Sequence, residues 1–550
     1  MKFSEAWLRE WVNPPVSTEE LADQLSMAGL EVDSVAPVAP AFSGVVVGRV
    51  LSIEPHPDAK KLRVCAVDTG NDEPLQIICG AANVAEGMRV PTALVGAMLP
   101  GDFKIKKARL RGVESFGMIC SASELGLAET SDGIMPLPTD APIGRDLRDY
   151  LTLDDSAIDV DLTPDRGDCL GMVGMAREVG VINRCQVNQP DYAEVAPLID
   201  DRCEVELLAD AACPRYLCRV IRGVDVNAET PMWMQERLRR SDIRSLGPVV
   251  DVTNYVMLEL GQPMHGFDLA RLTGPVRVRM AASDERLTLL GGQEIELKPD
   301  TLVIADAERP LALAGIMGGE ASAVSEQTGD ILLESAFFAP MAIIGKARAY
   351  GLHTDSSHRF ERGVDPQLQA VAMQRASALL IAIAGGRPGP VVEASNETKI
   401  AQRPEIHLRA QRLNRLLGVE VAQDEVVDIL TRLEMRVDAS DGGWRVRAPS
   451  CRFDIGIEED LIEEVGRIYG YARIPAHRGM SGMEMRGRAE MAYDLHRAKQ
   501  RLVDRDYQEV VTYSFVSPEL QQMIDPGLEG VKLANPISAD MSSMRTSLWP

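Results

Sequence analysis

The stretch GVVVGRVLSIE, residues 44–54, is the first of five short apolar runs that decide the fold of the chain's N-terminal part. The other four are KLRVCAVDT (61–69), LQIICG (75–80), RVPTALV (89–95) and FGMIC (116–120). Gly, Pro, Asn and Asp separate these runs, which is the pattern of short β-strands joined by turns. Five such strands predict a small barrel of the OB-fold kind, and we place it at residues 40–148.

A basic run lies inside the predicted barrel. KIKKARLR, residues 104–111, contains Lys104, Lys106, Lys107, Arg109 and Arg111. Charges on an edge strand discourage pairing with other strands. Taken alone, the run is therefore interpreted as a solvated strand edge.

Several blocks around the basic run resemble the tRNA-binding domain appended to several synthetases. They are HPDAKKLRVCAVDTG from residue 56, ICGAANV from residue 78 and GAMLPGDFKIKKARLRGVESFGMICSASELGL from residue 96. The only aromatic residues here are Phe42, Phe103 and Phe116, whereas readers of single strands usually stack bases on aromatic side chains. We therefore expect the five basic residues to meet tRNA phosphates and shape rather than to read bases.

Length and composition bound the class of protein. The 550 residues suffice for about three to five domains, and 45% hydrophobic with 25% charged residues is ordinary globular composition. Nine cysteines without a CxxC pair favour reduced thiols and a cytoplasmic protein. No apolar run approaches about 18 residues, so we expect no membrane span. A formal net charge of −24 opposes binding of nucleic acid by the whole surface, and we expect no DNA partner.

The stretch GLHTDSSHRFERGVDP, residues 351–366, is polar although apolar sequence lies on both sides of it. It offers little apolar material for a helix face or a strand to bury. Polar loops between packed elements often carry binding or chemistry. By itself the stretch fits an idle solvated connector equally well.

Four carboxylates near residue 460 are the best candidates for metal ligands. Asp460, Glu463 and Glu464 have the spacing i, i+3, i+4 and so share one face of a predicted helix, and Asp454 precedes them. Hard oxygen ligands of this kind suit Mg²⁺. The competing interpretation is an acidic, solvated helix start that the helix dipole favours.

The block RFDIGIEEDLIEEVGRIYGYARIP from residue 452 closely resembles the B5 domain of the bacterial phenylalanine--tRNA ligase (phenylalanyl-tRNA synthetase) beta-subunit family. TPDRGDCLGMVGMARE from residue 163 and the stretch 351–366 resemble the same family, in its order, over essentially all 550 residues. The chain is thus similar to a beta subunit that is truncated at its C-terminus. The resemblance implies that Mg²⁺ is held by Asp454, Asp460, Glu463 and Glu464.

The resemblance also implies a multidomain α+β fold. An N-terminal domain would comprise residues 1–39 and 149–200, with the tRNA-binding barrel at 40–148 inserted between its halves. A mixed α/β editing domain (B3/B4) would follow at 201–400 and a small helix-containing B5 domain at 401–476. Residues 477–550 would begin a class II synthetase-like module.

Family likeness places an editing pocket in the middle domain. Its predicted residues are His265, Gly318, Glu334, Thr354, Ser356 and the related position Thr253. Ser356 departs from the family's usual Ala and could narrow the pocket or add a hydrogen bond. Glu334 would accept the phenol of a misattached tyrosine, so that phenylalanine is refused. We expect His265 and Thr354 to orient the ester and a water without a covalent intermediate.

The functional expectation is a ligase subunit of the class II aminoacyl-tRNA synthetases in protein biosynthesis. An alpha subunit would use ATP at its own site to charge tRNA(Phe), in an (αβ)₂ heterotetramer, while this chain hydrolyses mischarged Tyr-tRNA(Phe) in cis. The alternative is a free-standing tRNA-binding chaperone or a trans-acting editing module.

Overall fold

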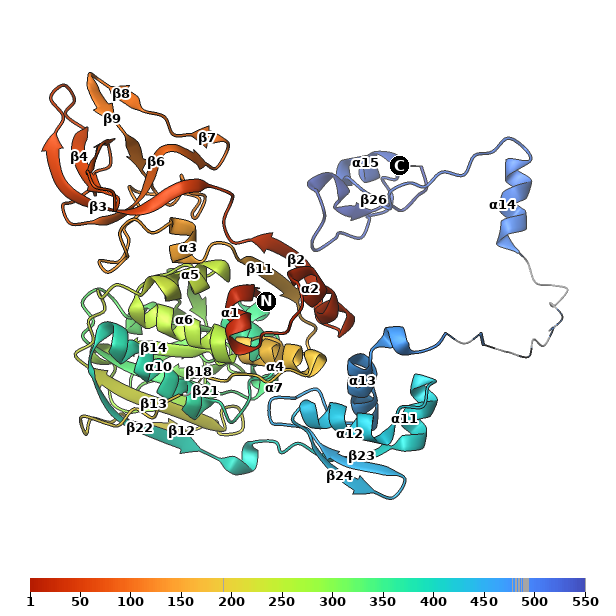
Figure 1. The fold of residues 1–550 in the computed structure, drawn as a ribbon. Helices are drawn as coiled ribbons and strands as arrows, with labels where there is room; N and C mark the ends of the chain where they lie inside the picture. Colours follow the sequence, from red (N-terminus) through yellow and green to blue (C-terminus); the bar gives the residue numbers. More distant parts are fainter. Residues whose placement is uncertain are drawn as a thin grey trace. The chain divides into compact units, whose positions relative to one another are not determined.

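The computed structural model describes residues 1–550 except 191, 477, 480, 481, 483, 484, 486, 488–493 and 550 (Figure 1). Contacts along the chain divide it into two units, residues 1–475 and 476–550. Each unit is described by itself. In the described residues no helix is long and apolar enough to cross a membrane.

The first sheet of unit 1 combines sequence from both sides of the predicted barrel. Its strand order is β1-β11-β2, with all pairs antiparallel. The strands are β1 (Lys2–Ser4), β2 (Glu31–Pro37) and β11 (Ser156–Asp161), and the helices are α1 (Glu5–Trp11), α2 (Thr18–Met27) and α4 (Met172–Asn183). Ser17 and Glu20 form a capping box at the start of α2, because each side chain bonds the other's backbone N–H.

All five apolar runs of the N-terminal part are strands. They are β3 (Ser43–Pro55), β4 (Arg63–Asp68), β5 (Leu75–Cys79), β6 (Arg89–Leu99) and β10 (Gly117–Ile119). Their order is β10-β6-β3-β4-β5, and β7 (Phe103–Lys104) pairs with β6. The remaining elements are β8 (Ala108–Leu110), β9 (Val113–Ser115) and α3 (Leu147–Leu151). The Phe116 N–H, just before β10, donates to Gln76 O on β5 at 2.9 Å, so the two ends of the sheet approach each other.

The middle of unit 1 is built on a sheet with the order β14-β21-β13-β22. Helices α6 and α10 contact one face of it (Figure 1). The strands are β14 (Met264–Asp268), β21 (Asp330–Phe337), β13 (Arg215–Arg222) and β22 (Arg387–Ser395), and the helices are α5 (Met232–Arg240), α6 (Pro248–Leu260) and α10 (Gln369–Ala384).

A second sheet, ordered β12-β15-β18-β19-β20, shares a core with the other face of the first. Its strands are β12 (Val205–Leu207), β15 (Val276–Met280), β18 (Leu302–Ala305), β19 (Pro310–Leu313) and β20 (Met317–Gly318). A hairpin of β16 (Arg286–Thr288) and β17 (Glu294–Glu296) and the short helices α7 (Pro340–Ile343) and α8 (Lys346–Ala349) complete this part.

Alternation along β13 and β21 assigns their side chains to the two faces. Leu217 and Leu333 belong to the core shared with α6 and α10. Tyr216, Cys218 and Leu332 belong to the core shared with the second sheet. Residues two apart on a strand point the same way, so Glu334 also points toward the second sheet.

The stretch 351–366 is not a loop throughout, and that expectation was wrong. Residues Asp355–Phe360 form the short helix α9, with Arg359 and Phe360 buried. Thr354 caps the helix, and the Arg359 Nε–H donates to Leu170 O at 3.0 Å. The polar sequence did not indicate this helix, because its buried face is formed partly by Arg359, whose guanidinium donates to a backbone carbonyl.

The last part of unit 1 is a sheet ordered β23-β25-β24 with three helices. The elements are β23 (Glu405–Arg409), β24 (Arg436–Ser440), β25 (Gly443–Arg447), α11 (Ala410–Leu417), α12 (Gln423–Arg432) and α13 (Glu458–Tyr469). Val181 of α4 belongs to the same hydrophobic core, so the N-terminal sheet region and this part pack together.

Unit 2 contains few regular elements in its described residues. They are α14 (Leu495–Val503), β26 (Phe515–Val516), α15 (Pro518–Ile524) and β27 (Ser543–Met544), with β26 and β27 paired. The predicted start of the last module, residue 477, lies outside the described residues.

Candidate functional site

The centre of the candidate site is a pair of side chains on neighbouring strands. His265 of β14 stands directly opposite Glu334 of β21 in the antiparallel register. Directly opposite residues carry their side chains on the same face of a sheet, about 5 Å apart at Cβ. That face is the one turned toward the second sheet, where Phe267 and Leu332 are buried.

Gly318 closes the site from the second sheet. A Cβ on Gly318 would lie 2.6 Å from His265 Cε1 and 2.8 Å from Nε2. Any other residue would therefore push the imidazole away. The structure thus brings together three of the six predicted pocket residues, His265, Glu334 and Gly318.

Burial shifts the pKa values of the pair in opposite directions. It lowers the pKa of His265 to about 4. It raises the pKa of Glu334 to about 8, and the nearby Tyr216 hydroxyl partly opposes the rise. Both side chains are therefore uncharged near neutral pH, because burial penalises the charged form of either group.

Two polar atoms of the pair lack partners. Among the described residues, His265 Nε2 and Glu334 Oε2 are buried and accept or donate no hydrogen bond. Buried polar atoms are almost always paired, because an unpaired one costs about 1–3 kcal/mol. The pair is thus suited to receive polar atoms of a ligand.

Thr354 and Ser356 fasten α9 to the turn before β20. The Thr354 hydroxyl donates to Ile316 O at 2.9 Å and accepts from the Ser357 N–H at 3.1 Å. The Ser356 hydroxyl donates to Gly315 O at 3.0 Å. Both side chains therefore hold the turn that carries Gly318, and both hydroxyl protons are already used.

Thr253 is placed differently from the other predicted residues. It lies on α6, and its hydroxyl donates to Val250 O of the same helix at 2.9 Å. In the described part of the chain, no hydrogen bond joins it to His265 or Glu334.

Sequence reasoning missed Tyr216. This residue of β13 has no exposed surface, and its hydroxyl has no hydrogen-bond partner that meets geometric criteria among described residues. The run RYLCRVIR contains no motif that marks it, because six consecutive residues of this strand, Tyr216 to Ile221, are buried and Tyr216 fits that ordinary pattern. Its relation to Glu334 appears only when the strands pair.

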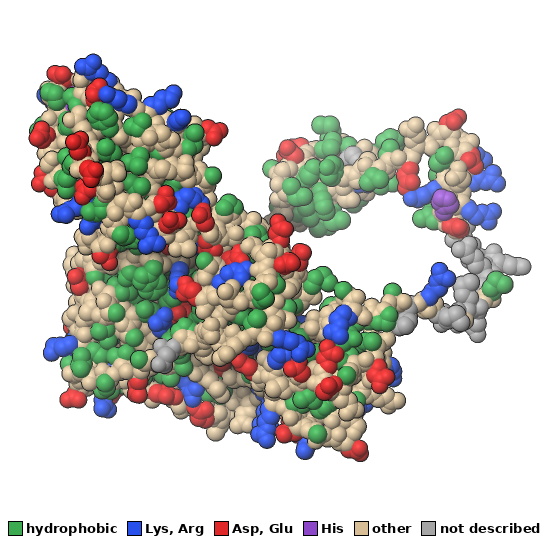
Figure 2. All heavy atoms as spheres, in the orientation of Figure 1, with side chains coloured by type: hydrophobic (Ala, Val, Ile, Leu, Met, Phe, Trp, Pro, Cys, Tyr) green, Lys and Arg blue, Asp and Glu red, His purple; other side chains and the backbone are tan. Residues whose placement is uncertain are grey.

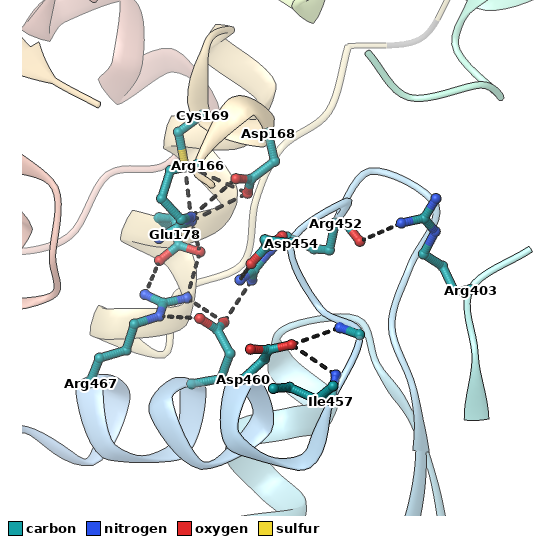
Figure 3. Close-up of polar contacts among 12 residues, drawn as sticks. Arg166, Asp168, Cys169, Glu178, Arg403, Arg452, Asp454, Ile457, Asp460 and Arg467 are labelled. Carbon is teal, nitrogen blue, oxygen red and sulfur yellow. Dashed lines mark hydrogen bonds and ion pairs between the residues drawn. The ribbon is translucent and has the colours of Figure 1, made fainter. Parts of the chain in front are cut away.

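The four predicted metal ligands are not gathered around one point. Arg452 donates to both oxygens of Asp454, at 2.9 and 2.6 Å, and to Glu464 at 2.6 Å (Figure 3). Arg467 donates twice more to Glu464 at 2.6 Å. Two arginines therefore already neutralise Asp454 and Glu464.

The other two predicted ligands have separate roles. Asp460 accepts from the backbone N–H groups of Gly456 and Ile457, at 2.7 and 2.9 Å, and so caps the start of α13 (Figure 3). Glu463 is exposed on the same helix. Partial burial, followed by the charges of Glu464 and Asp165, raises its pKa. These carboxylates fit Mg²⁺ in donor type but not in arrangement.

A different trio of potential ligands does lie close together. Within the described residues, Asp168, Cys169 and Glu178 are the group whose ligand atoms lie within 4.8 Å of one another. Arg166 contacts all three, at 3.1, 3.1 and 2.8 Å. Burial raises the pKa of the Cys169 thiol, which keeps it protonated. A guanidinium therefore already occupies the place a cation would take.

The five basic residues between residues 104 and 111 are all exposed. Figure 2 shows Lys and Arg side chains over the end of this N-terminal part that carries β7 and β8. Lys107 pairs with Glu114 at 2.9 Å and lies over the Phe116 ring. The other four have no ion pair among the described residues, and this leaves their charges available to a polyanion.

Family models match four parts of the chain. They are a tRNA binding domain at residues 45–146, the B3/4 domain at 212–385, the tRNA synthetase B5 domain at 406–471 and the phenylalanyl tRNA synthetase beta chain CLM domain at 474–550. His265, Gly318, Glu334 and Thr354 thus lie within the B3/4 match, and the five basic residues lie within the tRNA binding match.

Relatives match over the whole chain. The phenylalanine--tRNA ligase beta subunit of Methylococcus capsulatus is 59% identical over 549 residues, which are 100% of this chain and 69% of that protein. The beta subunits of Pseudomonas fluorescens and Vibrio vulnificus are each 57% identical, again over 100% of this chain and 69% of theirs.

Proposed function

This chain belongs to the phenylalanine--tRNA ligase beta-subunit family, and on that premise we propose that its His265–Glu334 pair hydrolyses tyrosine from mischarged tRNA(Phe). The charging reaction itself belongs to the ligase complex of which beta subunits are a part. In that complex the ATP site would lie on the alpha subunit.

One observation carries the editing proposal. An uncharged histidine and an uncharged acid face each other across β14 and β21, and each keeps a buried polar atom without a partner. A structural core would rarely keep two such atoms side by side, because hydrophobic residues would be more stable there.

Glu334 provides selectivity for tyrosine. A buried carboxyl can pair with the phenol of a misattached tyrosine. Phenylalanine has no hydroxyl and would leave the carboxyl unpaired. Sites that hydrogen-bond a substrate hydroxyl reject the analogue that lacks it by factors of about 10⁴–10⁵.

Hydrolysis uses a water placed beside His265. With a pKa of about 4, the imidazole is a weak base, so at neutral pH it orients the water by a hydrogen bond without storing its proton. The water oxygen bonds to the ester carbonyl carbon, the bond from that carbon to the ribose oxygen breaks, and the ribose oxygen takes the proton. The products are tyrosine and tRNA(Phe).

Thr354 and Ser356 support the site indirectly. Their hydroxyls hold the turn at Gly315 and Ile316, and this turn sets the position of Gly318 against the imidazole. Ser356 adds a hydrogen bond to the backbone, so its replacement by Ala would loosen the turn more than it would enlarge the site.

Replacing His265 by Ala or Glu334 by Gln tests the proposal. Each change should lower hydrolysis of Tyr-tRNA(Phe) by about 10²-fold while charging of tRNA(Phe) with phenylalanine stays within a factor of two. Unchanged hydrolysis in both variants would refute the assignment.

Gly318→Ala tests the geometry without touching either functional side chain. The added methyl would displace the imidazole, and a displacement of about 1 Å costs on the order of 10²-fold in rate. Gly329→Ala is the matched control, because a Cβ at Gly329 meets no atom within 4 Å. Hydrolysis should fall in the first variant only.

The assembly and the finer fold assignments are part of the same proposal. We assign the chain an alpha-subunit partner in an (αβ)₂ complex, a closed OB-type barrel at the tRNA-binding region and the beginning of a class II-like module in unit 2. Size-exclusion chromatography of the chain with and without the alpha subunit tests the assembly. A monomer that ignores the alpha subunit yet hydrolyses Tyr-tRNA(Phe) would favour the free-standing editing module instead.

Magnesium at Asp454, Asp460, Glu463 and Glu464 stays a prediction for this chain. Binding of a cation by all four would require Arg452 and Arg467 to release Asp454 and Glu464. No step of the proposed hydrolysis depends on the ion.

A further inference from the structure

Tyr216 is a buried residue with an unexplained polar atom. Its side chain has no exposed surface, and its hydroxyl has no hydrogen-bond partner among the described residues. Burying a hydroxyl without a partner costs roughly 1–3 kcal/mol, and phenylalanine would fill the same space without that cost. The hydroxyl therefore calls for a functional explanation.

The strand register relates Tyr216 to the site. Cys218 of β13 stands directly opposite Glu334 of β21, and Tyr216 lies two residues earlier on β13, on the same face. Diagonal neighbours across an antiparallel pair lie within reach of aromatic side chains. Glu334 thus has Tyr216 on one side and His265 of β14 on the other.

The polar atoms on this face match one another. Glu334 is 6% exposed and its Oε2 is unpartnered, as are the Tyr216 hydroxyl and His265 Nε2. A hydroxyl that donates and a carboxyl oxygen that accepts are complementary, whereas in this arrangement each is left unpaired.

We infer that the Tyr216 hydroxyl donates to one oxygen of Glu334 during editing and so aims the other oxygen at the phenol of the misattached tyrosine. Tyr216 is thereby a positioning residue that acts through Glu334 on the choice between tyrosine and phenylalanine. This inference rests on the proposed editing function.

Glu334 needs such a positioning residue because its carboxyl group can rotate. The terminal torsion of a glutamate is broad, so an unfixed carboxyl rotates and presents its oxygens in many directions. A donor on a rigid, fully buried ring removes that freedom before the substrate arrives, and such preorganisation increases selectivity.

Electrostatics is consistent with the inference. The nearby Tyr216 hydroxyl opposes the effect of burial on the pKa of Glu334. The other titratable groups that face the acid are His265 across β14 and the buried thiols Cys213 and Cys218. The Tyr216 hydroxyl is a donor at neutral pH and has no other partner among the described residues.

Tyr216→Phe tests the inference in the 550-residue chain assembled with the alpha subunit. It removes one oxygen and keeps the ring. We expect kcat/KM for hydrolysis of Tyr-tRNA(Phe) to fall about tenfold, the loss of roughly one hydrogen bond, while slow hydrolysis of Phe-tRNA(Phe) stays unchanged. The pH profile of the tyrosine reaction between pH 6 and 9 should also move upward, because Glu334 loses a donor that favours its ionised form.

A matched control separates this effect from general loss of a tyrosine hydroxyl. Tyr350→Phe removes a hydroxyl that lies 2.6 Å from that of Thr301, away from Glu334. This variant should keep both the preference for tyrosine and the pH profile of the parent chain.

A double variant decides whether Tyr216 acts through Glu334. If it does, Tyr216→Phe combined with Glu334→Ala, which removes the accepting oxygen, should hydrolyse Tyr-tRNA(Phe) at the rate of Glu334→Ala alone. Additive losses, or a parent-like preference and pH profile in Tyr216→Phe, would overturn the inference while leaving the editing function intact. A parent chain with no preference for tyrosine would overturn both.

Discussion

His265 and Glu334 are neighbours on one sheet face, and burial acts on them in opposite directions. The histidine loses its proton at a pH of about 4 and the acid at about 8. Both groups are therefore uncharged over a wide interval around neutral pH. Under the proposed function, this condition would let the buried pair bind a phenol and a water without first neutralising a charge.

The pair also predicts how stability depends on pH. A glutamate with an ordinary pKa of 4.5 and a folded pKa of about 8 stabilises the fold below pH 4.5 and loses that effect as pH rises to 8. A histidine with an ordinary pKa of 6.5 and a folded pKa of about 4 acts in the opposite sense between pH 4 and 6.5. From pH 6.5 to 8 only the loss due to Glu334 remains.

We therefore expect Glu334 to make the free energy of unfolding fall with pH between 6.5 and 8, by at most about 1.4 kcal/mol per pH unit. Glu334→Gln should remove that slope, whereas replacement of the exposed Glu296 by Gln should keep it. Urea unfolding at a series of pH values measures both. Equal slopes in the parent chain and Glu334→Gln would show that the acid is not held neutral.

At the scale of elements, a chain of buried charges joins α4 to α13. Glu178 of α4 binds Arg166 at 2.8 Å and Arg467 of α13 at 2.6 Å. Arg467 also pairs with Glu464, and Glu464 pairs with Arg452. Arg452 pairs in turn with Asp454, the last member of this series of ion pairs (Figure 3). The N-terminal sheet region and the part that contains α13 are thus connected by alternating charges that are almost entirely buried.

Arg467→Met should be strongly destabilising. It keeps most of the side-chain volume but leaves Glu178 and Glu464 buried with one cation fewer, which typically costs about 3–5 kcal/mol. Arg436→Met is the control, because its pair with Asp438 is 80% exposed on the arginine side and its loss should stay within about 0.5 kcal/mol. Chemical denaturation of both variants measures the difference.

The same series of buried ion pairs predicts the effect of removing metal ions. Because arginines neutralise Asp454 and Glu464, EDTA should leave the thermal midpoint of unit 1 unchanged within about 1 °C. A fall of several degrees, restored by Mg²⁺, would mean that a cation displaces these arginines in solution.

For the whole molecule, charge distribution matters more than net charge. A chain of net charge −24 repels a polyanion at long range, so tRNA must be met where basic side chains are concentrated. The exposed residues on β7 and β8 and in the turns beside them are such a place (Figure 2).

Replacing Lys104, Lys106 and Arg109 together by Ala should weaken tRNA binding and flatten its salt dependence. Each lost phosphate contact lowers the slope of log K against log salt by about 0.7–0.9. Arg286→Ala, which removes an exposed charge on β16 paired with Glu294, should change neither quantity. Filter binding or fluorescence anisotropy at several salt concentrations measures the slope. An unchanged slope in the triple variant would place the tRNA elsewhere.

Much of the fold could be predicted from local sequence. The five apolar runs between residues 44 and 120 became strands, because short apolar stretches between turn residues have few other stable conformations. The capping box of Ser17 and Glu20 is likewise a local feature, because its partners are only three residues apart. The helix within residues 351–366 was not predicted from local sequence, because Arg359 on its buried face is paired with the backbone of Leu170, far away in the chain.

The sequence by itself determined the family, through motifs such as RFDIGIEED and HTDSSHRF, and with it the residue types of the site. Only the tertiary structure decided which of those residues meet. The register of β14, β21 and β13 placed His265 and Tyr216 on either side of Glu334, and the approach of Gly318 closed one side. It also assigned Asp454 and Glu464 to arginines, one of which comes from the same helix and one from the preceding loop. The reason is physical: residue types and spacing are local properties, whereas pairing, burial and the resulting pKa shifts arise only when distant segments share one core.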